Sequence, residues 1–134
     1  MINSELQGAL QGILPAVITT VSKENIPNVS YISQVHFIDE KHLGISWQFF
    51  NKTYKNIQNN AQYSVVVTNP TTFSMWKIDL KLVEVLKEGD LFDEMDIALE
   101  AIASMCNAED FFKLKAVVVG EIVSIEQQFD GFNN

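Results

Sequence analysis

The residues best suited to chemistry lie directly after an apolar stretch: Asn51, Lys52, Thr53 and Lys55. They place an amide, a hydroxyl and two ammonium groups close together, which are groups that can bind a phosphate. The pattern predicts a helix over residues 52–59, whose free N–H groups and dipole would also favour an anion. Lys52 and Lys55 are three apart, so both can reach one phosphate on a helical turn. Two interpretations stay open: a phosphate site, or lysines that only solvate a loop.

The overall charge makes this pair of lysines conspicuous. The chain has 134 residues, a net charge of -8 and no arginine. Such an acidic balance argues against nucleic acid as a partner, because binding to phosphate backbones needs several cations. No apolar run approaches the roughly 20 residues needed to span a bilayer, so we expect no membrane partner. The start of the chain lacks signal-peptide features, and the single cysteine, Cys106, cannot form an internal disulfide, so we expect a cytoplasmic protein.

Hydrophobic periodicity predicts a mainly β fold that would position these residues. Strands are expected over residues 16–21, 28–38, 43–49, 63–68, 74–87 and 111–126, and helices over 4–12, 52–59 and 91–105. Short connections favour antiparallel neighbours, so six strands with one long helix between the fifth and the sixth indicate a small barrel. Residues 1–134 are expected to form a single domain, which could be the N-terminal part of a longer chain.

Alternation along the second and third predicted strands separates an apolar face from a polar one. Val29 and Tyr31 are predicted on the apolar face of the second strand. On the third strand, Trp47 alternates with apolar residues and is interpreted as core, whereas Ser46 and Gln48 point the other way. The polar face is either a wet outer surface or the wall of a polar site.

Other residue types give little sign of chemistry. His36 and His42 flank one predicted hairpin, but no third ligand of a suitable type is evident, so no metal site is predicted. There is no glycine-rich phosphate loop and no nucleophile elbow. No residue stands out as a proton-transfer group, so the catalytic residues stay unknown.

The order of elements resembles the pyridoxamine 5'-phosphate oxidase-like family of FMN-binding split barrels. The resemblance covers residues 5–126 and is carried by the strand 16–21 with its turn ending in Pro27, by the strand beginning at Asn28, and by the lysine turn. Residues 55–60 then lead into a valine-rich strand, as in the family. Ala61 stands where the family usually has a proline.

The resemblance implies a cofactor, a partner and a set of binding residues. It implies FMN, with the phosphate held at Asn51, Lys52, Thr53 and Lys55 and the ring lying along Ser46, Trp47 and Gln48. It also implies a homodimer with the cofactor groove at its interface, acting on an unknown small-molecule substrate. We therefore expect a flavin-dependent oxidoreductase or a flavin-binding sensory unit.

One departure from the family limits the expected activity. Oxidases of pyridoxamine phosphate grip their substrate with arginine and histidine residues near the C-terminus, and this chain has nothing comparable after Val123. True pyridoxamine phosphate oxidase activity is therefore not expected. The alternative hypothesis is a non-catalytic regulatory or dimerisation barrel without a bound cofactor.

Overall fold

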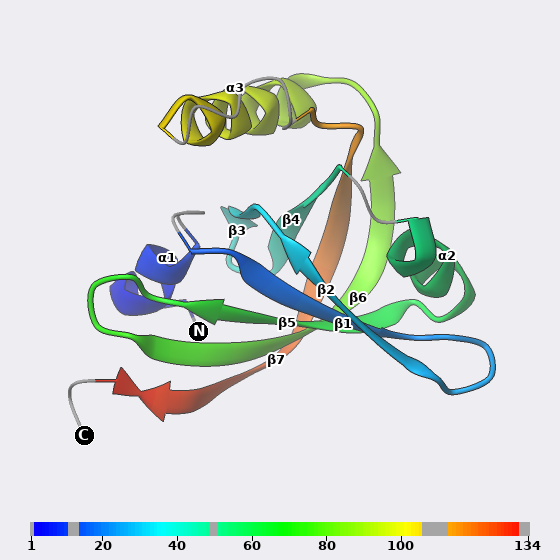
Figure 1. The fold of residues 1–134 in the computed structure, drawn as a ribbon, viewed down its shortest axis with the longest axis horizontal. Helices are drawn as coiled ribbons and strands as arrows, with labels where there is room; N and C mark the ends of the chain where they lie inside the picture. The colour runs from blue at the N-terminus through cyan, green and yellow to red at the C-terminus, as the bar shows by residue number, and fades with distance from the viewer. Residues whose placement is uncertain (1, 11–13, 49–50, 106–112, 132–134) are drawn as a thin grey trace.

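Three helices and seven strands make up the computed structural model, which describes residues 2–10, 14–48, 51–105 and 113–131 (Figure 1). In chain order they are α1 (Ser4–Ala9), β1 (Ala16–Val21), β2 (Pro27–Ile32), β3 (Val35–Asp39), β4 (His42–Trp47), α2 (Asn51–Asn59), β5 (Gln62–Thr68), β6 (Ser74–Leu86), α3 (Asp90–Met105) and β7 (Ala116–Asp130). The mainly β prediction and the position of the long helix between the last two strands are confirmed. Cys106 and the first residues of the predicted strand 111–126 lie outside the described residues.

All seven strands belong to one antiparallel sheet in the order β2-β1-β5-β6-β7-β4-β3. The long strands β6 and β7 form its middle, and three register shifts interrupt their pairing. Such irregularities bend a strand and increase its twist. The sheet therefore curves strongly, and β6 and β7 run through most of the molecule in Figure 1.

The prediction of one continuous strand over residues 28–38 is wrong. The chain leaves the sheet at Ser33 and Gln34, so that β2 pairs with β1 whereas β3 pairs with β4. β2 and β3 are the two edges of the sheet, and only these two residues connect them. A connection this short can span only a few ångströms per residue, so the edges must come close together. This crossover turns the curved sheet into a split barrel with seven strands rather than six.

Two apolar clusters hold the barrel and its long helix. The inner cluster contains the fully buried Ile18, Ile45, Val65 and Ile78, which come from four different strands. The second cluster lies between α3 and the outer side of β7, where Met95 and Leu99 pack with Val117 and Val119. Residues 116–119 are therefore buried on both faces of the sheet, which explains the continuous valine run in this segment.

The predicted orientation of β2 is also wrong. Val29 and Tyr31 are 64% and 74% exposed, whereas Ile32 is buried. The pairing of β2 with β1 places Tyr31 opposite Val17 and Val29 opposite Thr19, both on the outer face of the sheet. Alternation in the sequence identified two faces here, but it could not say which one meets the core, since β2 is an edge strand.

Candidate functional site

Two of the predicted phosphate ligands lie in one cavity between α2 and the turn that joins β1 to β2. The cavity has a volume of about 500 Å³. Lys52 and Lys55 line it from α2, and Lys23 and Glu24 line it from the turn. Three ammonium groups against one carboxylate give the cavity a positive balance in a chain of net charge -8. An anion is the ligand that this charge favours.

Lys23 is the residue that the sequence analysis missed. It lies in a turn in which the Ser22 hydroxyl accepts hydrogen bonds from the backbone N–H groups of Glu24 and Ile26, at 3.2 and 3.1 Å. Asn25 adopts a positive φ of 63°, which asparagine tolerates better than most residues. The lysine is almost thirty positions away from Lys52 in sequence, so only the folding of this turn against α2 reveals that it belongs to the cavity.

Two polar contacts, one buried and one partly buried, fix α2 on the hairpin of β1 and β2. Asn28 donates a hydrogen bond from Nδ2 to the Thr53 hydroxyl at 3.1 Å, and Asn56 donates from Nδ2 to the Thr20 hydroxyl at 3.1 Å. Thr53 is 1% exposed and does not line the lysine cavity. Its position therefore assigns it to holding the helix in place.

Asn51 was predicted just before the helix, but α2 already includes it as its first residue. Its side chain lies outside the described part of the structure. The nine-residue helix begins beside the lysines, so the N–H groups of its first turn add to the positive character of this region.

The predicted ring-binding residues lie at the crossover between β2 and β3. The Ser46 hydroxyl donates to the Gln34 carbonyl at 3.3 Å, and Gln48 donates from Nε2 to the Ser33 hydroxyl at 2.9 Å. Both side chains are buried, at 1% and 4% exposure. Gln48 Oε1 has no hydrogen-bond partner among the described residues. A buried acceptor of this kind is costly unless a donor reaches it.

Trp47 connects this crossover to the lysine helix. Its ring stacks on Tyr54 of α2, with centroids 4.1 Å apart and an angle of 16° between the planes. Trp47 is half-buried and packs against the inner cluster, as its alternation with apolar residues predicted. This stack therefore joins the end of β4 to α2.

The perturbed carboxylate of Asp79 lies elsewhere, on the outer face of β6. The hydroxyls of Ser64 and Ser124 donate to it, at 2.5 and 2.9 Å, and Lys77 lies 3.6 Å away. These contacts, with the Ser64 hydroxyl the strongest, hold the pKa of Asp79 below its usual value. Its neighbours therefore satisfy the charge of this carboxylate.

The two histidines have different carboxylate partners, and neither lines the lysine cavity. His42 bonds to Asp39 at 2.9 Å, and His36 Nε2 lies 3.7 Å from the Glu94 carboxylate on α3. Among the described residues, no group of three histidine, cysteine or acidic side chains is placed to hold a metal ion. No helix in the same part of the chain is long and apolar enough to cross a membrane.

Comparison with solved structures shows the same fold in proteins of distant sequence. An FMN-binding protein from Syntrophomonas wolfei subsp. wolfei matches with a TM-score of 0.76 and 22% identity, over 96% of this chain and 88% of that chain. HupZ of Group A Streptococcus matches with a TM-score of 0.70 and 18% identity, over 98% and 97% of the two chains. An F420 reductase matches with a TM-score of 0.63 and 13% identity, over 90% and 94%. At these identities the likeness establishes the fold alone.

Sequence comparison gives the family. None of the curated proteins matches this chain. The family model described as pyridoxamine 5'-phosphate oxidase, however, matches residues 2–129, which is nearly the whole chain. Together with the split barrel, this match shows that the chain belongs to the pyridoxamine 5'-phosphate oxidase family.

Proposed function

We propose that this protein binds FMN, with the phosphate in the lysine cavity and the flavin ring against the end of β4. The observation that carries the proposal is the cavity itself, where Lys23, Lys52 and Lys55 meet in an otherwise acidic chain. The FMN-binding protein of the same fold supports it. Bound FMN would supply electron or hydride transfer, and the protein would supply binding and orientation.

The lysine cavity suits a phosphate monoester in charge and in size. Lys52 and Lys55 lie one helical turn apart and are exposed, so their ammonium groups are free to turn toward an anion. Ammonium groups act as point charges rather than as a bidentate fork, so the affinity depends on how many of them converge. Lys23 supplies the third charge from the opposite wall.

The crossover offers a matching group for the flavin ring. Gln48 Oε1 is a buried acceptor without a partner among the described residues, and the flavin ring carries an imide N–H donor. Trp47, the neighbour of Gln48 in the chain, stacks on Tyr54 of the lysine helix. We therefore assign Gln48 and Trp47 to the ring side of the site, and Lys52, Lys55 and Lys23 to the phosphate side.

A second candidate function is a regulatory or dimerisation barrel without a cofactor. The side chains of Ser46 and Gln48 already bond to Gln34 and Ser33, so the crossover is largely satisfied without any ligand. Activity on pyridoxamine phosphate is not part of the proposal, because the chain has no arginine to grip that substrate. An oxidoreductase and a flavin-binding sensor both remain compatible with a bound flavin.

The outer face of β2 is the surface that we propose for a homodimer. Tyr31 and Val29 expose 74% and 64% of their area there. The apolar surface continues across the sheet, because Tyr31 pairs with Val17, and Val17 pairs with Val66. A second copy of this chain is the occupant that the family's two-barrel arrangement favours. Sedimentation velocity should show a dimer that Tyr31→Asp dissociates and that Ile97→Asp, on α3, leaves intact.

The visible absorption spectrum tests the cofactor directly. The purified protein is mixed with FMN, passed through a desalting column and scanned for paired flavin bands. We expect retained flavin in the wild type, a loss in Lys52→Glu with Lys55→Glu, and a weaker loss in Lys23→Glu. The matched control, Lys81→Glu with Lys87→Glu, changes the net charge equally at exposed sites outside the cavity.

The outcomes separate the two candidate functions. A folded wild-type protein that retains no flavin would favour the barrel without a cofactor. Flavin retained at normal stoichiometry in the double variant of Lys52 and Lys55 would refute the phosphate site. Loss of flavin in the control double variant as well would indicate a general effect of charge rather than this cavity.

A further inference from the structure

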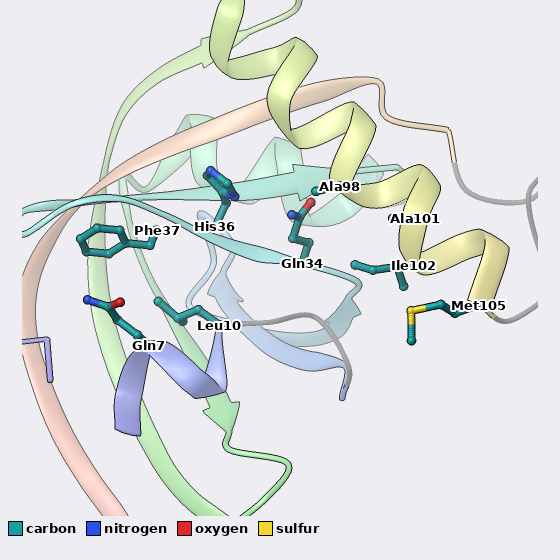
Figure 2. A pocket seen from close by; sticks show the side chains of 9 residues that line it. All are labelled: Gln7, Leu10, Gln34, His36, Phe37, Ala98, Ala101, Ile102 and Met105. Carbon is teal, nitrogen blue, oxygen red and sulfur yellow. The ribbon is translucent and has the colours of Figure 1, made fainter. Parts of the chain in front are cut away.

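A second cavity lies between the C-terminal end of α1, β3 with its crossover, and the C-terminal half of α3 (Figure 2). It has a volume of about 400 Å³, which falls within the range of small-molecule sites. One wall comes from Gln34 of the crossover and His36 of β3. The opposite wall comes from α3, with Ala98, Ala101, Ile102 and Met105. None of its lining residues belongs to the lysine cavity.

Gln34 gives this cavity a buried hydrogen-bond acceptor. The residue is 5% exposed, and its Oε1 atom has no hydrogen-bond partner among the described residues. Figure 2 shows its amide extending from the crossover toward Ala98 on α3. An unpaired buried acceptor is costly, and a ligand that brings an N–H or O–H donor would remove that cost.

The α3 wall of the cavity is apolar, and two of its side chains are small. Ala98 and Ala101 present only methyl groups, and the larger side chains of Ile102 and Met105 extend the apolar surface. Met105, the last residue of α3, is 78% exposed. Methionine is flexible and polarizable, so it can adapt its shape to a bound ring.

Charge distinguishes this cavity from the lysine cavity. The described residues that line it include no lysine, and their one basic side chain, His36, already faces a carboxylate. The helix above it carries only acidic groups, one of which, Glu94, faces His36 at 3.7 Å. The acidic residues of this helix are Asp90, Asp93, Glu94, Asp96 and Glu100. Their summed field disfavours a phosphorylated or carboxylated ligand.

We propose that this cavity is a second ligand site, for a small, mostly apolar ring compound that is neutral or cationic and donates a hydrogen bond to Gln34. The proposal goes beyond FMN binding and does not require it, since the two cavities share no lining residue. It also separates this chain from enzymes that act on phosphorylated pyridoxamine. In the proposed function the phosphate of FMN lies in the lysine cavity, whereas the cavity under α3 selects by apolar contact and by one acceptor, Gln34 Oε1.

Three naphthalene probes of nearly equal size test this selectivity by isothermal titration calorimetry. They are 1-naphthylmethylamine, 1-naphthalenemethanol and 1-naphthoate, which are cationic, neutral and anionic at pH 7. We expect the amine and the alcohol to bind, and the carboxylate to bind about tenfold more weakly or not at all. Equal binding of the three probes, preference for the carboxylate, or no binding of the amine and the alcohol would overturn the proposal.

Two variants tie the binding to the cavity. Ala101 is exposed, so Ala101→Trp should fill the cavity without disturbing the core and should abolish binding. Ile97→Trp is the matched control, because Ile97 is 68% exposed on the same helix but does not line the cavity. Gln34→Leu should weaken the binding of the alcohol by about three- to tenfold, which is the contribution expected of one hydrogen bond. Unchanged binding in Ala101→Trp, with its fold confirmed by circular dichroism, would contradict the assignment.

Flavin retention in the same variants separates this inference from the proposed function. Ala101→Trp should retain FMN as the wild type does, because the lysine cavity is untouched. If the wild type binds the amine but no flavin, the proposed function fails and the second site stands. If it binds flavin but none of the probes, the second site fails and the proposed function stands.

Discussion

Replacing Gly120 with alanine would force a methyl group against the hydroxyl of Tyr63. Gly120 lies in β7 next to β6, and a Cβ atom built there would also lie 3.2 Å from Tyr63 Cζ and 3.3 Å from Leu80 Cβ. Tyr63 is 3% exposed, so its ring has little freedom to move away. We therefore expect Gly120→Ala to destabilise the protein through this one contact.

The size of the effect follows from two opposing terms. Overpacking a close-packed core costs about 1–3 kcal/mol. Alanine also restricts the unfolded chain, which returns about 0.4–1 kcal/mol. The expected net loss is about 1–2 kcal/mol, which lowers the melting temperature by roughly 3–8 °C in a domain of this size.

Tyr63→Phe should rescue the alanine variant. The Tyr63 hydroxyl is buried without a hydrogen-bond partner among the described residues, and this burial raises the pKa of the phenol. Removing the hydroxyl should therefore be neutral or stabilising on its own, by about 0–1 kcal/mol. In the double variant the alanine methyl has lost its worst clash, so a coupling energy of about 1–2 kcal/mol is expected.

Urea unfolding of the wild type, the two single variants and the double variant gives this coupling as a double-mutant cycle. Additive effects of Gly120→Ala and Tyr63→Phe would refute the reasoning. So would a large loss of stability in Tyr63→Phe alone, because that would show the hydroxyl to be well bonded.

Three further predictions follow from contacts in the structure. The pKa of Asp79 is lowered from 3.8, so its contribution to stability is present above about pH 4 and is lost as the pH falls through the native pKa; Asp79→Asn should give a flatter acid-unfolding curve by circular dichroism. Asn56→Ala breaks a buried hydrogen bond and should cost about 1–3 kcal/mol in urea unfolding, whereas Asn59→Ala, at an exposed site, should cost less than about 0.5 kcal/mol. Tyr54→Ala removes the stacking partner of Trp47, so it should cost at least about 0.5–1.5 kcal/mol and change the tryptophan emission spectrum; an unchanged spectrum would contradict the stacking.

The sequence predicted correctly those elements whose apolar residues follow a single period from end to end. The strand expected over residues 74–87 is β6, because Trp76, Ile78 and Leu80 alternate into the core without interruption. The long helix is α3, whose repeated apolar residues pack on β7. In both segments one face is continuously apolar, so a different register would expose it to water.

The break at Ser33 and Gln34 could not be predicted from local pattern. Both residues are compatible with a strand, and the break exists because the two halves of this segment pair with different partners far away in the chain. The same cause hid the orientation of Tyr31, since an edge strand can present an aromatic residue outward. Long-range pairing decided these features, and a single sequence carries little information about it.

In the candidate site, too, some residues could be predicted from local spacing and others only from the fold. Lys52 and Lys55 follow from helical spacing alone, and the structure places both in one cavity. Lys23 joins them only through the packing of a turn against α2. Ser46 and Gln48 were identified as a polar face, but their burial against Ser33 and Gln34 depends on the crossover. Residue type and spacing thus suggested the chemistry, whereas the fold decided which groups meet.

The central position of β7 in the sheet has a consequence for the order of folding. β4 is flanked by β3 and β7, so one side of β4 stays without its native neighbour until the last strand is available. On a ribosome, at ~5–20 residues per second, the chain between these strands takes roughly several seconds to appear. During that time the hairpin of β3 and β4 presents an open edge and the apolar residues of β4, which makes it a target for chaperones or for a strand of another chain. Addition of β7 joins the two halves in a single late step, so barrel closure is expected to be the slow and cooperative event of folding.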